Sequence, residues 1–269
     1  MQTTFLGGLK VSRLCYGTEP FNLKKGPDDD QSQGDKTPTE GGRILAEAVK
    51  LGVNMWDTSD DYGTHPHVRE GLKLVKRGSV VVADKTNASN YREGIEAVDS
   101  ALKDLDTDYI DIMFLHIVPP KTVERKDSNG STYICHDLKG RKGTLKAFNE
   151  ARNSGLIKKI ALSTHSTETL RQVIDHPEID IVCAPLNKQA TYLDDGTQQM
   201  RLDALKALHD IGMGVYVIKL LAAGRYRDDA EACIRYALGF NDFIDVWNIG
   251  MYDIADVKRN ITLFIEALK

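Results

Sequence analysis

The sequence predicts a single (β/α)8 TIM barrel that follows a short N-terminal hairpin. Short segments that are apolar nearly throughout alternate with amphipathic segments, and this unit recurs about eight times in 269 residues. Strands with two apolar faces pair in parallel beneath helices, and eight such units in about 250 residues are typical of one barrel domain. A doubly wound sheet is the alternative, but no GxGxxG motif follows any predicted strand.

The predicted elements run in order along the chain. Residues 5–14 contain Gly7-Gly8 and should form the hairpin, and a first barrel strand leads into residues 15–18. Further apolar segments predict strands at 53–57, 79–84, 109–116, 157–163, 179–184, 214–221 and 243–249. Apolar residues that recur every three or four positions predict helices at 42–51, 68–78, 95–105, 145–155, 170–174, 202–212, 230–238 and 254–268. We expect one domain over residues 1–269, with polar loop insertions near 22–40 and 119–141.

The composition argues against several classes of partner. The net charge of −4 offers no electrostatic attraction for nucleic acid or an anionic membrane. We expect no signal peptide and no membrane span, because the chain has neither a basic N-terminal region before an apolar run nor about 18 consecutive apolar residues. The cysteines form no CxxC pair and predict a reduced, cytoplasmic protein without a zinc or iron–sulfur site; they are Cys15, Cys135, Cys183 and Cys233. The oligomeric state stays open.

Ionisable residues follow three consecutive predicted strands. Asp57 ends the second barrel strand, and Tyr62 lies five residues later. Lys85 follows the third strand, and His116 ends the fourth. Because neighbouring parallel strands are about 4.8 Å apart and their carboxyl ends carry the chemistry of a barrel, we expect these side chains to converge.

These residue types suit hydride transfer to a carbonyl group. The oxygen of such a carbonyl gains negative charge and needs a proton donor, a role that Tyr62 could fill if its pKa were lowered. A neighbouring Lys85 ammonium should lower that pKa, and Asp57 should pair with the lysine. His116 should orient the carbonyl oxygen through a hydrogen bond. The same residues could run the reaction in reverse, as alcohol oxidation.

Two other expectations concern residues near this cluster. Trp56 precedes Asp57 and should face the opposite side of its strand, against helices. His65 and His67 have the spacing of a metal-binding pair, but no third ligand lies at a useful spacing. We therefore expect loop histidines and no metal site.

The chain resembles the aldo-keto reductase superfamily in segments that cover nearly its whole length. The matching segments are 52–63, 84–86, 108–116, 155–163 and 250–251. The resemblance implies a barrel that binds NADP(H) or NAD(H) without a Rossmann domain. It also implies that Asp57, Tyr62, Lys85 and His116 are the catalytic residues. The segments 163–165 and 218–224 are most similar to bacterial and archaeal members.

The resemblance further implies which residues contact the nucleotide. They are Gly17, Thr18, Asp57, Ser163, Thr164, Cys183, Ile218, Lys219, Gly250, Met251 and Asn260. In this set Cys183 stands where the family has an amide side chain, and Ile218 stands where it has a stacking aromatic ring. Asp253 and Asp256 lie where the family usually clamps the 2′-phosphate of NADP with Lys, Ser and Arg. We therefore expect a reduced, or even reversed, preference for NADP, because a carboxylate near the ribose favours NAD.

We interpret the chain as an NAD(P)-dependent oxidoreductase that interconverts a small aldehyde or ketone and its alcohol, with Tyr62 as general acid/base. Two alternatives remain at this stage. One is a non-catalytic, nucleotide-binding regulatory subunit, and the other is an isomerase or lyase that reuses the same residues. The sequence does not indicate the substrate, since the two insertions contain no recognisable motif.

Overall fold

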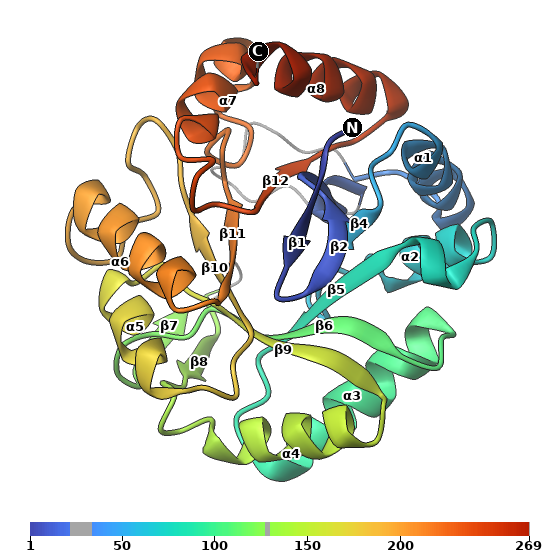
Figure 1. Ribbon diagram of the computed structural model, residues 1–269. Coiled ribbons are helices and arrows are strands. Elements are labelled where there is room, and N and C mark those ends of the chain that lie inside the picture. The colour runs from blue at the N-terminus through green and yellow to red at the C-terminus, as the bar shows by residue number, and fades with distance from the viewer. Residues whose placement is uncertain (22–33, 127–129, 269) are drawn as a thin grey trace.

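The computed structural model describes residues 1–21, 34–126 and 130–268. Within them, eight parallel strands close into a barrel, as Figure 1 shows in a view along its axis. The barrel strands are β3 (Leu14–Gly17), β4 (Met55–Asp57), β5 (Val81–Thr86), β6 (Ile110–Leu115), β9 (Ile157–Ser163), β10 (Ile181–Pro185), β11 (Gly214–Ile218) and β12 (Val246–Gly250). Around the ring they follow the order of the chain, and β12 pairs with β3 to close it. The predicted (β/α)8 barrel is confirmed.

Helices surround the barrel and alternate with its strands (Figure 1). They are α1 (Pro38–Lys50), α2 (His65–Leu72), α3 (Tyr91–Leu105), α4 (Lys142–Asn153), α5 (Thr167–Gln172), α6 (Gln198–Asp210), α7 (Ala230–Leu238) and α8 (Ile254–Ala267). No helix among the described residues is both long enough and apolar enough to cross a membrane.

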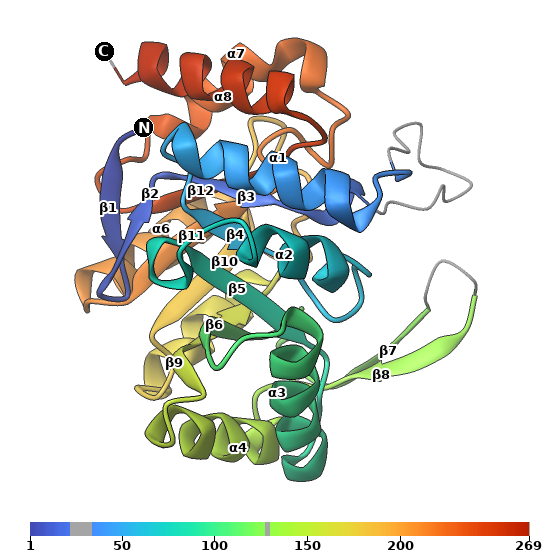
Figure 2. The ribbon, with the colours of Figure 1, turned by 90° about the vertical axis from the view of Figure 1, so that its right-hand side faces the viewer.

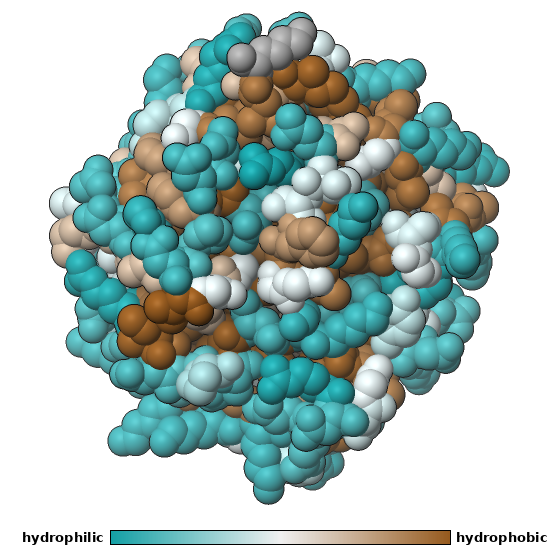
Figure 3. Space-filling view, in the orientation of Figure 1, coloured by the Kyte–Doolittle hydropathy of each residue, from teal (hydrophilic) through white to brown (hydrophobic). Residues whose placement is uncertain are grey.

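The N-terminal hairpin covers one end of the barrel. Strands β1 (Thr3–Leu6) and β2 (Leu9–Ser12) pair antiparallel around Gly7 and Gly8, whose φ angles are +53° and +86°. Leu6 is fully buried in the cluster that fills the barrel. Figure 2 places this hairpin at the end of the barrel opposite the carboxyl ends of the barrel strands. The face that carries it is mainly hydrophilic, with hydrophobic residues in separate patches (Figure 3).

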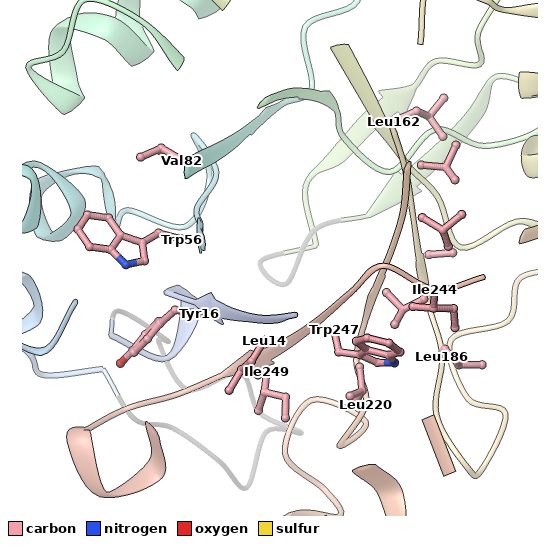
Figure 4. Close-up of a cluster of buried hydrophobic side chains, with 14 of the residues drawn as sticks. Leu14, Tyr16, Trp56, Val82, Leu162, Leu186, Leu220, Ile244, Trp247 and Ile249 are labelled. Carbon is pink, nitrogen blue, oxygen red and sulfur yellow. The ribbon is translucent and has the colours of Figure 1, made fainter. Parts of the chain in front are cut away.

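The core has two layers because side chains alternate along each barrel strand. Val81 and Ala83 of β5 point into the barrel, whereas Val82 points outward to the layer between strands and helices. Trp56 is fully buried in this outer layer, as predicted, and Figure 4 shows it with Tyr16 and Val82. The same alternation therefore aims the neighbouring residues, Asp57 and Lys85, inward.

The two predicted insertions differ in structure. Most of the first, residues 22–33, lies outside the described residues. The prediction that the first helix begins at Gly42 was wrong: α1 begins at Pro38, after a capping box in which the side chains of Thr37 and Glu40 bond each other's backbone N–H groups.

The second insertion contains a hairpin rather than only a loop, which corrects the prediction for residues 119–141. Strands β7 (Val123–Lys126) and β8 (Thr132–Cys135) pair antiparallel and extend away from the barrel (Figure 2). An ion pair of 2.8 Å between Arg125 and Asp194 joins this hairpin to the loop after β10.

Candidate active site

The carboxyl ends of two neighbouring strands bring a buried ion pair together. Asp57 is the last residue of β4, and Lys85 lies near the end of the adjacent β5. Lys85 Nζ is 2.6 Å from Asp57 Oδ1 and donates a second hydrogen bond, of 2.8 Å, to the carbonyl of Thr58. Lys85 is 1% exposed and Asp57 is 3% exposed. An ion pair buried to this degree needs close geometry and further hydrogen bonds, and both are present.

Tyr62 and His116 lie against this ion pair. Tyr62 is in the loop between β4 and α2, and Lys85 Nζ lies 4.8 Å from the centroid of its ring. His116 directly follows β6, and its ring meets that of Tyr62 edge to face at 6.0 Å between centroids. The predicted convergence of the four residues is therefore observed.

Lys85 and Asp57 keep each other charged through their mutual attraction. Burial lowers the pKa of Lys85, but the charge and hydrogen bond of Asp57 outweigh burial, so the pKa is raised overall. Burial also raises the pKa of Asp57, and the ammonium of Lys85 opposes that rise. The lysine remains an ammonium at neutral pH and presents its positive charge to the ring of Tyr62.

The expected direction of the Tyr62 pKa was wrong. Loss of solvent around the hydroxyl raises this pKa well above its ordinary value, and the carboxylates of Glu19 and Asp57 raise it further. Lys85 does not outweigh these effects, because its charge is already balanced by Asp57 at 2.6 Å. Half-buried Tyr62 is thus a neutral phenol, which is the form that can donate a proton.

His116 is a neutral imidazole. Burial lowers its pKa well below the ordinary value, and the positive charges of Lys85 and Arg141 lower it further. Its Nδ1 lies 3.4 Å from Ser59 Oγ and 3.5 Å from Asp61 Oδ2, so both groups help to fix the ring. A neutral imidazole carries one N–H and can donate one hydrogen bond without introducing another charge.

The predicted nucleotide-contact residues on β3 and β12 form the wall beside Asp57. Thr18 Oγ1 donates a 2.8 Å hydrogen bond to the carbonyl of Asp57. Gly17 and Gly250 pair across the two strands, and the N–H of Met251 donates to the carbonyl of Gly17 at 3.3 Å. A Cβ on Gly17 would lie 2.5 Å from Asn248 Oδ1, so this position has no room for a side chain.

The polar side chains at the end of β9 are largely engaged in hydrogen bonds within the protein. Thr164 Oγ1 donates to the carbonyl of Val118 at 2.7 Å and accepts the N–H of Ser166 at 3.0 Å. Ser163 Oγ accepts the N–H of Ile117 at 2.9 Å but keeps its own proton available. Cys183 is fully buried on the inner side of β10. Of these three side chains, Ser163 is the best placed to donate to a ligand.

The other predicted contacts lie on β11 and α8. Ile218 ends β11 and is partly exposed, and Lys219 follows it with a left-handed φ of +61°. Lys219 Nζ is 3.6 Å from Glu19 Oε2. Asn260 lies on α8, is 1% exposed, and neither its amide oxygen nor its amide nitrogen has a hydrogen-bond partner among the described residues.

Carboxylates occupy the N-terminus of α8. Asp253 caps the helix by accepting the N–H of Asp256 at 2.9 Å, and Asp256 accepts the N–H of Tyr252 at 3.0 Å. Arg259 is bound to Asp256 at 2.8 Å, whereas Lys258 is exposed. The helix dipole and the arginine charge are therefore already matched by the protein's own carboxylates.

Two site residues escaped the sequence prediction. Tyr216 points into the barrel from β11, bonds to Asn248, and opposes the rise in the pKa of Asp57. Its inward position was readable from strand alternation once the register was known. Arg141 is 1% exposed and donates to the carbonyl of Thr86, which also accepts the N–H of His116. Nothing in the sequence around Arg141 predicts that contact.

The two histidines after the loop that carries Tyr62 are helical, which corrects the prediction of loop residues. His65 and His67 lie in the first turn of α2 and are buried. His65 Nε2 is 3.0 Å from Asp84 Oδ1, and His67 Nε2 is 2.8 Å from the carbonyl of Lys36. Across residues 1–21, 34–126 and 130–268, no three His, Cys, Asp or Glu side chains are placed to hold a metal ion.

Comparison with known proteins identifies the family. The profile of the Aldo/keto reductase family matches residues 13–236. The chain belongs to this family. An aldo-keto reductase of Bacillus halodurans in its holo form superposes with a TM-score of 0.72 at 19% identity over 98% of this chain and 90% of that one. An aldo-keto reductase of Bombyx mori in complex with NADP superposes at 0.69 and 18% identity, covering 99% and 90%.

Curated members of the family are similar to this chain at low identity. L-galactose dehydrogenase of Arabidopsis thaliana is 26% identical over 81% of this chain and 64% of its own length. NADH-dependent D-xylose reductase of Candida parapsilosis is 28% identical over 64% of this chain and 56% of its own length. NADPH-dependent aldose reductase of Saccharomyces cerevisiae is 26% identical, covering 64% and 57%. The chain thus spans less than two thirds of each of these relatives.

Proposed function

We propose that this aldo/keto reductase transfers hydride between a nicotinamide nucleotide and a small carbonyl compound or alcohol. The observation that supports this activity is the contact of Tyr62 with both the buried Lys85–Asp57 pair and the ring of His116. A neutral phenol, an ammonium and a neutral imidazole at one barrel rim offer a proton, a fixed charge and a hydrogen-bond donor. Carbonyl reduction needs all three.

Each side chain has a separate role in the reaction. When bound, the nucleotide supplies the hydride that attacks the carbonyl carbon. Tyr62 donates its proton to the carbonyl oxygen as negative charge develops there, and the resulting phenolate is stabilised by the ammonium of Lys85. Asp57 holds that ammonium in place, and His116 orients the carbonyl oxygen. Solvent then returns a proton to Tyr62; alcohol oxidation follows the same path backward, with the phenolate as base.

The residues that surround Asp57, Tyr62, Lys85 and His116 fit a nucleotide. Gly250 ends β12 at the rim and is exposed, and it pairs there with Gly17 of β3. Asn260 offers an amide whose donor and acceptor atoms are both unsatisfied within the described part of the chain. A buried amide without partners is costly, and polar groups of a ligand would remove that cost. Ser163 would donate to the carboxamide, and Ile218 would give the ring an aliphatic surface.

The charges at the start of α8 favour NAD over NADP in this proposal. Asp253 and Asp256 already satisfy the helix N-terminus that a 2′-phosphate would otherwise use. Arg259 is engaged by Asp256, so a phosphate there would have to compete with a carboxylate. Curated relatives include both NADH-dependent and NADPH-dependent reductases, so the family accommodates either choice.

We propose a polar, hydroxylated carbonyl compound as the substrate. The names of the relatives specify sugars, namely L-galactose and D-xylose. Glu19, Asp61 and Lys219 lie around Tyr62 and His116 and could hydrogen-bond to hydroxyl groups. We also place the protein in a reducing cytoplasm, because its four cysteines are buried and unpaired.

A deuterium-transfer assay tests the activity. The protein would be incubated with reduced nucleotide, deuterated at C4, and a panel of aldoses, simple aldehydes and ketones. The proposal requires deuterium at the carbonyl carbon of at least one product. Tight nucleotide binding without any turnover would favour a regulatory subunit, and turnover without deuterium transfer would favour an isomerase or lyase.

A further inference from the structure

A cavity of about 420 Å³ lies outside the barrel wall, behind the loop that carries Tyr62. Its base is formed by the outward side chains of Asp84 on β5 and Met113 on β6, and its far wall is formed by α3. Helices α2 and α3 flank β5 on the side that Figure 2 presents. Asp84 neighbours Lys85 but points the opposite way, so this cavity is distinct from the proposed active site.

The lining of this cavity is strongly acidic. It contains five carboxylates and, among the described residues, neither Lys nor Arg. Two of these carboxylates are engaged at the rim, since Glu93 accepts hydrogen bonds from Ser89 and Glu96 pairs with Arg92. The remaining three are Asp60, Asp84 and Asp104. His65 also lines the cavity, with its Nε2 at 3.0 Å from Asp84 Oδ1 and its Nδ1 at 3.7 Å from Asp104 Oδ2.

One buried carboxylate oxygen in this lining lacks a donor. Asp84 is fully buried, and its Oδ1 is bound by His65 Nε2 at 3.0 Å. Its Oδ2 has no hydrogen-bond partner in the described part of the chain. Leaving a buried acceptor of this kind unsatisfied costs about 1–3 kcal/mol, and more when it is charged. A donor that enters the cavity would therefore be stabilised there.

We propose that this cavity binds a small organic cation, a linear alkyl diamine in its ammonium form. An ammonium supplies three donors and a positive charge, which suit the free oxygen of Asp84 and the carboxylate of Asp104. Ala97, Ala101 and Met113 provide an apolar surface for methylene groups. The acids are spread along the cavity rather than clustered for a metal ion among the described residues, and such spacing suits an extended molecule with two charged ends.

An occupant would contact the loop that carries Tyr62. Asp60 lines the cavity, and its backbone N–H donates to the carbonyl of Lys85 at 3.1 Å. Ser59 Oγ lies 3.3 Å from the same carbonyl oxygen. A cation held by the side chain of Asp60 would thus restrain the loop from behind. The inference does not depend on the proposed oxidoreductase activity, because binding itself is measured.

Isothermal titration of the intact protein with 1,4-diaminobutane, in phosphate buffer free of other amines, tests the proposal. We expect saturable binding at one site, weaker binding of butylamine, and no binding of neutral 1,4-butanediol. Affinity should fall as sodium chloride is added, because salt screens the carboxylates. Equal heats for the diamine and the diol, or a response to magnesium chloride equal to that of the diamine, would overturn it.

Substitutions on α3 test whether the diamine binds in this cavity. Ser100→Lys places an ammonium at the cavity lining from the exposed side of α3 and should weaken diamine binding at least ten-fold. Asp104→Asn should weaken it about three-fold or more. Asp99→Asn removes the same charge from an exposed position of α3 that does not line the cavity, and its affinity should stay within two-fold. Circular dichroism establishes that each variant is folded. Unchanged affinity in folded Ser100→Lys would refute the site.

Discussion

The Lys85→Met substitution would leave the carboxylate of Asp57 buried without its ammonium partner. The two side chains are 1% and 3% exposed and lie 2.6 Å apart, so little water can replace the lost charge. Removing one member of such a pair typically costs about 3–5 kcal/mol, which corresponds to a fall in Tm of roughly 6–20 °C for a domain of this size. Thermal unfolding followed by circular dichroism measures the change. Methionine keeps much of the apolar volume, so the loss reports mainly the charge.

The pH dependence of this variant has a definite sign. The pKa of Asp57 is already raised in the folded protein, and without Lys85 it rises further. The folded variant therefore binds a proton that the unfolded chain releases near pH 4, and its stability falls as pH rises from there to the folded pKa of Asp57. The difference in unfolding free energy between wild type and variant should be smaller at pH 5 than at pH 8.

Two further variants control this experiment. Lys206→Met removes a lysine whose ion pair with Asp210 is 57% and 56% exposed, and it should change stability by less than about 0.5 kcal/mol. The double variant Asp57→Asn with Lys85→Met has no unpaired charge and should be more stable than the sum of the single effects predicts. A Lys85→Met variant as stable as Lys206→Met, or strict additivity in the double variant, would show that Lys85 does not compensate the buried charge of Asp57.

Three other predictions follow from the site. Because the pKa of His116 is held well below its ordinary value, kcat/KM should show no inflection near pH 6.5 from this residue; an inflection there that is abolished in His116→Asn would contradict it. Asp256→Asn should raise the affinity for NADPH relative to NADH by about 1 kcal/mol, roughly five-fold, as measured by fluorescence titration, and an unchanged ratio would count against the assigned clamp. Gly17→Ala places a methyl group 2.5 Å from Asn248 Oδ1 and should destabilise the fold by about 1–3 kcal/mol. Gly78→Ala, which meets no atom within 4 Å, is the matched control in denaturant unfolding and should stay within about 0.5 kcal/mol of wild type.

The sequence was sufficient for the barrel and for the convergence of the four ionisable residues. Apolar segments at regular spacing specify parallel strands, and residues that end neighbouring strands must then meet at one rim. The start of α1 was missed although Thr37 and Glu40 carry a capping-box signature. The β7–β8 hairpin was missed because β7 is polar and both strands are only four residues long and partly buried, so they lack the long apolar signal of the barrel strands.

Electrostatics within the site could not be predicted from the sequence in the same way. The direction of the Tyr62 pKa depends on how far its hydroxyl is removed from solvent and on the carboxylate of Glu19, which lies 43 positions away in sequence. Arg141 lowers the pKa of His116 from a position at the barrel rim that no local sequence pattern predicts. Desolvation and contacts between distant segments are properties of the folded chain.

The Tyr62→Phe variant tests whether Tyr62 is the proton donor. The measurement is kcat/KM for the best substrate from the aldehyde and ketone panel, with Tyr91→Phe, an exposed tyrosine on α3, as the control. Loss of general acid catalysis should lower kcat/KM by about 10²–10⁴-fold while nucleotide affinity stays within a few-fold of wild type. Turnover by folded Tyr62→Phe within a few-fold of the wild-type and Tyr91→Phe values would contradict the account.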